Sequence, residues 1–113
     1  MTEKEEISLK YRKKWLGELR EMLFKNIDTS KYAIFLFGSA VNNLVKAHDI
    51  DIGILGNEKL PIRTESDIYY IIEESIIPMK VDIVDFAVVS DDFRKTAFSE
   101  IEIWNKPQNI ILN

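Results

Sequence analysis

Three aspartates and a Gly-Ser pair are the residues whose types and spacing could do chemistry in this chain. Asp49 and Asp51 are two positions apart, and side chains at i and i+2 of a strand point the same way, with Cα atoms about 6.5 Å apart. Two carboxylates on one face repel each other, and aspartate is a poor strand former. A divalent cation between them would reverse the sign of that interaction. The alternative is a solvent-facing strand whose exposed positions happen to be aspartate.

A third aspartate, Asp82, lies in an apolar run where it shares a strand face with Val84 and Phe86. A carboxylate there is costly unless it is paired or bound to a metal ion. The alternative is that this face lies at a sheet edge open to water. Asp85 stands nearer the end of the run and is expected to be exposed, so we favour Asp82 over Asp85 as a functional residue.

The pair Gly38-Ser39 directly follows a buried-strand pattern. Glycine permits a tight turn and lets a backbone N–H approach a ligand closely. Serine supplies a hydroxyl that can cap a following helix, and the donors at a helix start suit phosphate. A capped helix start without any ligand is the alternative explanation.

Composition limits the kind of site that is possible. The chain has no cysteine and a single histidine, His48, which excludes disulfides and sites rich in cysteine or histidine. A metal ion must therefore bind mainly oxygen ligands, as Mg²⁺ does. The net charge of −4 argues against direct nucleic-acid binding. No apolar run predicts a membrane span or a signal peptide, so we expect a cytoplasmic protein.

The hydropathy pattern predicts an α/β (α+β) fold with a small sheet flanked by helices, and residues 1–113 are expected to form a single domain. We predict seven elements: a helix over 8–26, a strand over 32–37, a short helix over 40–47, a strand over 48–55, a helix over 65–77, a strand over 80–89, and a helix capped by Asp91 that extends towards Trp104.

The conjunction of these motifs is more specific than any one of them. A phosphate-binding turn follows one strand, an Asp-x-Asp lies on the next, and a third aspartate lies on the strand after that. Phosphoryl-type transfer with two metal ions needs a triphosphate anchor and a few carboxylates that hold both ions.

In these motifs the sequence resembles the minimal nucleotidyltransferases of the DNA polymerase β-like superfamily, which are partners of HEPN-domain proteins in prokaryotic toxin–antitoxin modules. The resemblance rests on Leu36 to Ser39, His48 to Ile52 and Val81 to Val84, and it covers the chain from Tyr32 to about Arg94. It implies the nucleotidyltransferase fold, with a small mixed sheet.

The resemblance also implies roles for the residues. Gly38 and Ser39 would hold the β- and γ-phosphates of ATP. Asp49 and Asp51 would bind two Mg²⁺ ions, and Asp82 would complete the second metal site and help deprotonate or orient the acceptor hydroxyl. The implied reaction is AMP transfer from ATP to a tyrosine of a HEPN toxin encoded by the neighbouring gene, which makes the chain an antitoxin, with a homo- or hetero-oligomer possible.

The sequence departs from the family pattern after the Gly-Ser pair. Members commonly have Gly-Ser-Arg-x-Arg-Gly, whereas Ala40 and Asn42 stand at the arginine positions here. Each lost charge-assisted contact is worth about 1.5–3 kcal/mol, although Lys46 could replace part of the charge. A second hypothesis is therefore a catalytically weak or inactive antitoxin that neutralises its partner by binding. A third, a transferase for small molecules, is less favoured because no substrate domain is evident.

Overall fold

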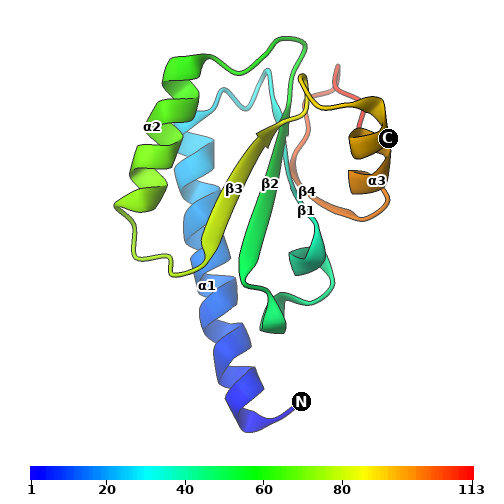
Figure 1. Ribbon diagram of the computed structural model, residues 1–113. Helices are drawn as coiled ribbons and strands as arrows, with labels where there is room; N and C mark the ends of the chain where they lie inside the picture. The colour runs from blue at the N-terminus through cyan, green and yellow to red at the C-terminus, as the bar shows by residue number, and fades with distance from the viewer.

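The computed structural model describes residues 1–113, and it has an α/β architecture built on one sheet (Figure 1). The elements in chain order are α1 (Glu3–Asn26), β1 (Ala33–Phe37), the 3-10 turns η1 (Ser39–Val41) and η2 (Leu44–Lys46), β2 (Asp49–Leu55), α2 (Ile62–Glu73), β3 (Lys80–Asp85), α3 (Asp91–Ala97) and β4 (Ile101–Asn105). The predicted fold class is confirmed.

The sheet has four strands in the order β3-β2-β1-β4. β1 pairs antiparallel with both β2 and β4, while β2 and β3 are parallel, so the sheet is mixed as expected. The end of β1 therefore meets the starts of β2 and β3 at one end of the sheet. The two central strands are almost wholly buried, which explains their continuous apolar pattern.

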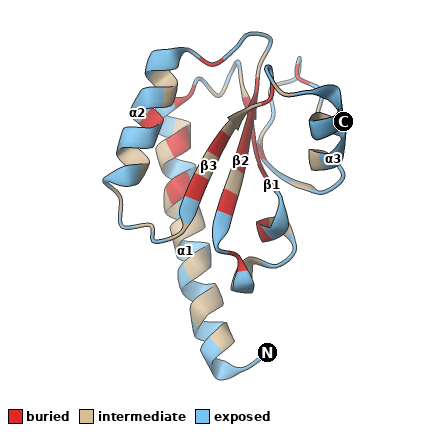
Figure 2. Cartoon of the chain, viewed as in Figure 1, coloured by how far each residue is buried: buried red, intermediate tan, exposed pale blue.

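Two apolar clusters hold the layers together, one on each face of the sheet. The larger joins α1 and α2 to the sheet through residues such as Leu23, Ile52 and Ile68. The smaller lies beneath α3 and the C-terminal tail and is rich in phenylalanine, with Phe35 and Phe86 fully buried at its centre. Figure 2 shows the buried residues concentrated in the strands and in the part of α1 that faces them.

Helix α1 begins at Glu3, earlier than the predicted start at residue 8. A capping box explains the early start: Glu5 N donates to Thr2 Oγ1 at 3.1 Å, and Thr2 N donates to the Glu5 carboxylate at 3.1 Å. The N-terminal half of α1 projects past the end of the sheet (Figure 1), and its apolar residues Ile7 and Tyr11 are about half exposed, at 52% and 51%. None of the helices combines the length and the apolar character that a membrane-spanning helix requires.

The predicted helix extending from Asp91 towards Trp104 is wrong in its second half. Ser90, not Asp91, is the N-cap, because its hydroxyl accepts from Phe93 N at 3.1 Å. The helix ends at Ala97, and Ile101–Asn105 forms β4 along the free edge of β1.

Three other boundaries also differ from the prediction. The helix expected over 40–47 consists of the two 3-10 turns, and α2 spans Ile62–Glu73 rather than 65–77. Ser75 Oγ donates to Ile72 O at 2.6 Å just beyond the end of α2, which uses a terminal carbonyl of the helix. β3 ends at Asp85 rather than at residue 89, because the Asp85 carboxylate accepts from Ala87 N at 3.0 Å and forms a turn.

Candidate functional site

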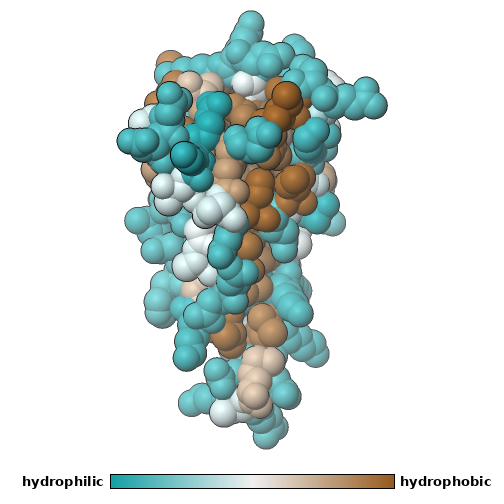
Figure 3. Space-filling model, turned by 90° about the vertical axis from the view of Figure 1, so that its right-hand side faces the viewer, coloured by the Kyte–Doolittle hydropathy of each residue, from teal (hydrophilic) through white to brown (hydrophobic).

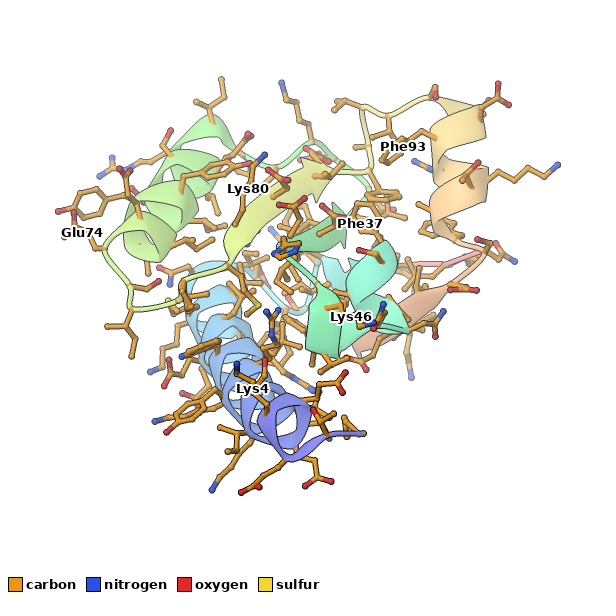
Figure 4. All side chains as sticks on the ribbon, turned by 60° about the horizontal axis from the view of Figure 1, so that its bottom comes forward. Lys4, Phe37, Lys46, Glu74, Lys80 and Phe93 are labelled. Atoms are coloured by element: carbon orange, nitrogen blue, oxygen red, sulfur yellow. The ribbon has the colours of Figure 1, made fainter.

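The three aspartates come together at the end of the sheet where β1 finishes and β2 and β3 begin. Asp51 is paired with Phe37 of β1 on one side and with Asp82 of β3 on the other. Figure 4 views the molecule from this end, with Phe37 and Lys80 both near the junction. The parallel register of β2 and β3 therefore places two carboxylates on neighbouring strands, as a shared metal site requires.

The alternation of β2 explains why its aspartates face outward. Ile50 and Ile52 are fully buried against the helices, and this turns Asp49 and Asp51 towards the opposite face. Asp49 is exposed and Asp51 is half-buried. The prediction that both carboxylates share one face agrees with this pattern of burial.

Asp51 is the electrostatic centre of the cluster. Burial is the main cause that raises the pKa of its carboxyl group, and the neighbouring charges of Asp82 and Asp49 raise that pKa further. Lys80 acts in the opposite direction. The three carboxylates are thus near enough to interact, and holding Asp51 ionised costs free energy that a bound cation would recover.

Lys80 is a functional candidate that the sequence reasoning missed. Its Nζ lies 3.8 Å from Asp82 Oδ2, and both side chains are open to water, with exposed fractions of 71% and 43%. Lys80 and Asp82 are two residues apart on one strand, so the i, i+2 rule applied to Asp49 and Asp51 would have found the pair.

The residues present suit a hard divalent cation, although no group of three acidic or histidine side chains converges closely enough to enclose an ion. Three like charges repel one another, and Asp82 turns to Lys80 instead. The donors are all carboxylate oxygens, the ligands that Mg²⁺ prefers. The raised pKa of Asp51 also fits a position where positive charge is needed.

Gly38 is required by its surroundings rather than by the turn alone. Its φ is +77°, a backbone conformation that residues with a side chain rarely adopt. A Cβ atom at this position would lie 2.5 Å from Asp51 Oδ2. The backbone of the Gly-Ser turn therefore lies directly against the carboxylate at the centre of the cluster.

Ser39 is the first residue of η1, and no side-chain hydrogen bond caps that turn. The expectation that Ser39 caps a following helix is therefore wrong. Ser39 is exposed beside Gly38, so its hydroxyl is accessible to a ligand.

A cavity of about 370 Å³ adjoins the turn, formed by Phe37, Gly38, Ser39, Phe93, Thr96, Ala97, Ser99 and Glu100. Figure 4 shows Phe37 and Phe93 on this side of the site, with ring centroids 6.0 Å apart.

Other sequence candidates have different surroundings. Asp85 is half-buried rather than exposed, and its carboxylate accepts from Leu60 N at 2.8 Å, so its role is structural. His48 lines a groove beside α1 with Tyr11 and Pro78. Lys46, the last residue of η2, lies near enough to Glu5 of α1 for their charges to interact.

The position of the first absent arginine is also informative. Ala40 is only 2% exposed and belongs to the core that packs α1 on the sheet. The second position, Asn42, is exposed, and its side-chain amide donates to Glu100. Only position 42 could therefore offer a charged side chain to the solvent-facing site.

Comparison with known proteins gives a consistent result. Residues 18–109 match the family described as "Polymerase beta, Nucleotidyltransferase". The chain is 34% identical over 65 residues to the probable protein adenylyltransferase MntA of Haemophilus influenzae, and the match covers 57% of this chain and 57% of the relative. The aligned region therefore spans little more than half the length of that relative.

Similar folds occur in solved complexes. One is the MNT antitoxin complex with a tri-AMPylated HEPN toxin of Shewanella oneidensis, with a TM-score of 0.63 and 21% identity, covering 84% of this chain and 73% of the other. Another is a toxin–antitoxin structure with AMP-PNP, with a TM-score of 0.64 and 22% identity, covering 82% and 75%. At these identities the likeness establishes the fold.

Proposed function

Since this chain belongs to the polymerase β nucleotidyltransferase family, we propose that it is a magnesium-dependent protein adenylyltransferase. It transfers AMP from ATP to a hydroxyl group, that of a tyrosine, on a HEPN-domain partner encoded by the neighbouring gene. The chain thereby acts as the antitoxin of a toxin–antitoxin pair in the cytoplasm.

One observation carries this proposal: Asp51 stands between the Gly38 backbone and the partner strand that bears Asp82. The Gly-Ser turn, which would bind the phosphates, and the carboxylates of Asp51 and Asp82 are thus adjacent. Transfer of a nucleotidyl group requires this proximity, because the triphosphate must be held while its α-phosphate lies at the carboxylates.

Each residue of the site would have a separate role in the reaction. Gly38 and Ser39 would bind the β- and γ-phosphates through backbone N–H groups and the serine hydroxyl. Asp49, Asp51 and Asp82 would hold two Mg²⁺ ions, which supply positive charge to the phosphate oxygens when bound. Asp82, whose side chain is 43% exposed, would accept the proton of the acceptor hydroxyl. The hydroxyl oxygen then bonds to the α-phosphorus, the bond to the bridging oxygen breaks, and pyrophosphate leaves.

The named relatives support this chemistry. The Haemophilus influenzae protein is described as a probable protein adenylyltransferase, and the HEPN toxin in the Shewanella oneidensis complex carries AMP groups. A second structure of similar fold contains AMP-PNP, an analogue of ATP. Each of these facts concerns another protein, and together they favour ATP as donor and a protein as acceptor.

Surface features support a protein partner. The projecting half of α1 reaches past the same end of the sheet as the aspartates (Figure 1), and a groove of about 290 Å³ runs between it and the segments before β2 and β3. On the α3 side, Figure 3 shows a band of apolar side chains among hydrophilic ones. Ile103 and Ile111 are exposed at 49% and 70%, whereas Trp104 and Ile110 are buried. The apolar segments 101–104 and 110–112 are thus only partly available to a partner.

A second candidate function is neutralisation by binding alone. The absence of arginine after Ser39 favours it, because the triphosphate loses charge-assisted contacts. The cluster of Asp49, Asp51 and Asp82 opposes it, since clustered carboxylates are costly unless they bind a cation.

Labelled ATP separates the two functions. The purified chain is mixed with Mg²⁺ and the HEPN-domain protein encoded by its neighbouring gene, using ATP labelled at either the α- or the γ-phosphate. Adenylyl transfer predicts that the α-label appears on the partner and the γ-label does not. The variant Asp49→Asn/Asp51→Asn should lose transfer, while Asp67→Asn, an exposed aspartate on α2, should retain it.

Two results would overturn the enzyme. Transfer of the γ-label would indicate phosphorylation instead. Absence of transfer, with tight complex formation by both the native chain and the double variant, would leave the binding antitoxin.

A further inference from the structure

We propose that Tyr69 is a positioning residue that holds β3 in place and thereby sets the position of Asp82 beside Asp51. The inference rests on the proposed function for its Mn²⁺ and rate measurements, whereas the hydrogen-exchange measurement is independent of it. Tyr69 belongs to α2 and does not reach the carboxylates themselves, so it would act through the strand.

β3 is an edge strand, which explains why it needs such support. It pairs only with β2, so the backbone groups on its outer side have no neighbouring strand. An edge held on one side frays more easily than a central strand. Because the site depends on the register between Asp51 and Asp82, displacement of β3 would separate its carboxylates.

The hydroxyl of Tyr69 takes the place of a fifth strand at one residue. It donates to Ile83 O at 3.1 Å and accepts from Ile83 N at 3.3 Å. One side chain thus pairs with both backbone groups that a neighbouring strand would use.

The residue that Tyr69 contacts is adjacent to Asp82. Backbone groups of successive strand residues point to opposite edges, so those of Asp82 point towards β2 when those of Ile83 point outward. The Ile83 side chain is buried in the core at 7% exposure, which turns the Asp82 side chain to the opposite face. Tyr69 therefore restrains the backbone at the residue next to the carboxylate, from the side opposite to β2.

Tyr70 provides a matched comparison within the same helix. It carries the same chemical group one position away but is 66% exposed, whereas Tyr69 is 40% exposed and bonds to β3. Phenylalanine at either position removes one hydroxyl and preserves the ring, so packing is retained. Any difference between the two variants therefore reports the contact with Ile83.

The test compares Tyr69→Phe with Tyr70→Phe in the full chain. Hydrogen exchange measured by NMR should show the Ile83 amide of Tyr69→Phe exchanging about tenfold faster, as loss of one hydrogen bond predicts. Mn²⁺ titrated without nucleotide should bind at least threefold more weakly. In the labelled-ATP assay kcat should fall while the KM for ATP changes little, because Gly38 and Ser39 lie on another segment. Tyr70→Phe should match the native chain in all three measurements.

The outcomes are separable from those of the proposed function. If the native chain binds Mn²⁺ but transfers no AMP, the exchange and Mn²⁺ measurements still test the positioning role. Native Mn²⁺ affinity in Tyr69→Phe, despite faster exchange at Ile83, would overturn the proposal, since the contact would then stabilise the edge without setting the site. Equal effects of the two variants would overturn it as well.

Discussion

The backbone of Gly38 lies against the carboxylate of Asp51, so closely that a Cβ atom at position 38 would stand 2.5 Å from Asp51 Oδ2. This relationship joins two motifs that are 13 positions apart in the sequence, counted from 38 to 51. It makes the Gly-Ser turn and the aspartates parts of one site, and it means that glycine at this position serves the site as well as the turn.

Replacing Gly38 by alanine should damage both function and folding. The new methyl group meets Asp51, and alanine at φ +77° is strained, so we expect at least a tenfold loss of transfer and a loss of about 1–3 kcal/mol in the free energy of unfolding. Urea denaturation and the labelled-ATP assay measure these effects. Gly17→Ala is the control: with nothing near its Cβ in α1, it should gain about 0.5–1 kcal/mol. Native behaviour of Gly38→Ala would refute the close approach.

Asp51→Asn should stabilise the protein at neutral pH when EDTA is present. The pKa of Asp51 is raised on folding, so between its ordinary value of 3.8 and the raised value the folded state binds more protons than the unfolded state. The native chain therefore loses stability as pH rises through that window. The advantage of Asp51→Asn should be full above it and should vanish below pH 3.8. Denaturation of both proteins across the window checks the sign, and an advantage independent of pH would contradict it.

Divalent cations should offset the stability that the native chain loses when its clustered carboxylates are ionised. We expect Mg²⁺ or Mn²⁺ to raise the Tm of the native chain, and a concentration of 100 times the Kd corresponds to about 2.7 kcal/mol. Asp49→Asn/Asp51→Asn should show little response, because it lacks the charged ligands. Asp67→Asn, whose exposed carboxylate lies on α2, should respond like the native chain. An equal Tm shift in all three proteins would mean that the ion binds elsewhere.

Arg12 should stabilise the segment that leads from the Gly-Ser turn into β2. Its guanidinium donates to Ala47 O and, at 3.4 Å, to Leu44 O, so it ties α1 to the segment between the Gly-Ser turn and β2. Arg12→Met keeps an apolar stem but leaves these carbonyls without their donor, and we expect a loss of about 1–3 kcal/mol in urea denaturation. Lys13→Met, exposed on the same helix, should change stability by less than about 0.5 kcal/mol.

Arginine restored at position 42 should strengthen nucleotide binding, whereas arginine at position 40 should not be tolerated. Asn42 is exposed beside the turn, so Asn42→Arg can offer a charged donor to the phosphates, and we expect the KM for ATP to fall by up to about tenfold. Ala40 is 2% exposed, so Ala40→Arg would place a charged side chain in the core and should unfold the turn η1. Equal gains from both variants would show that the turn is positioned differently.

The sequence predicted well wherever local pattern and burial agree. The apolar run of β1 and the alternation of Asp49 to Leu55 indicated strands, and both are strands. β4 was missed because Phe93, Ala97 and Ile101 follow a helical spacing. Ile101 and Ile103 also alternate with Glu102 and Trp104, which is the spacing of a strand. What makes 101–105 a strand is the unpaired edge of β1, which no local pattern reveals.

The sequence alone determined which chemistry was available: oxygen ligands only, a Gly-Ser turn after a buried strand, and three aspartates on later strands. Only the tertiary structure decided how these parts meet. The register opposes Asp51 to Asp82, Gly38 approaches Asp51 without space for a side chain, and Tyr69 supports β3. The physical reason is that residue type is local, whereas distance between strands depends on sheet order, register and the helices that cover the edges.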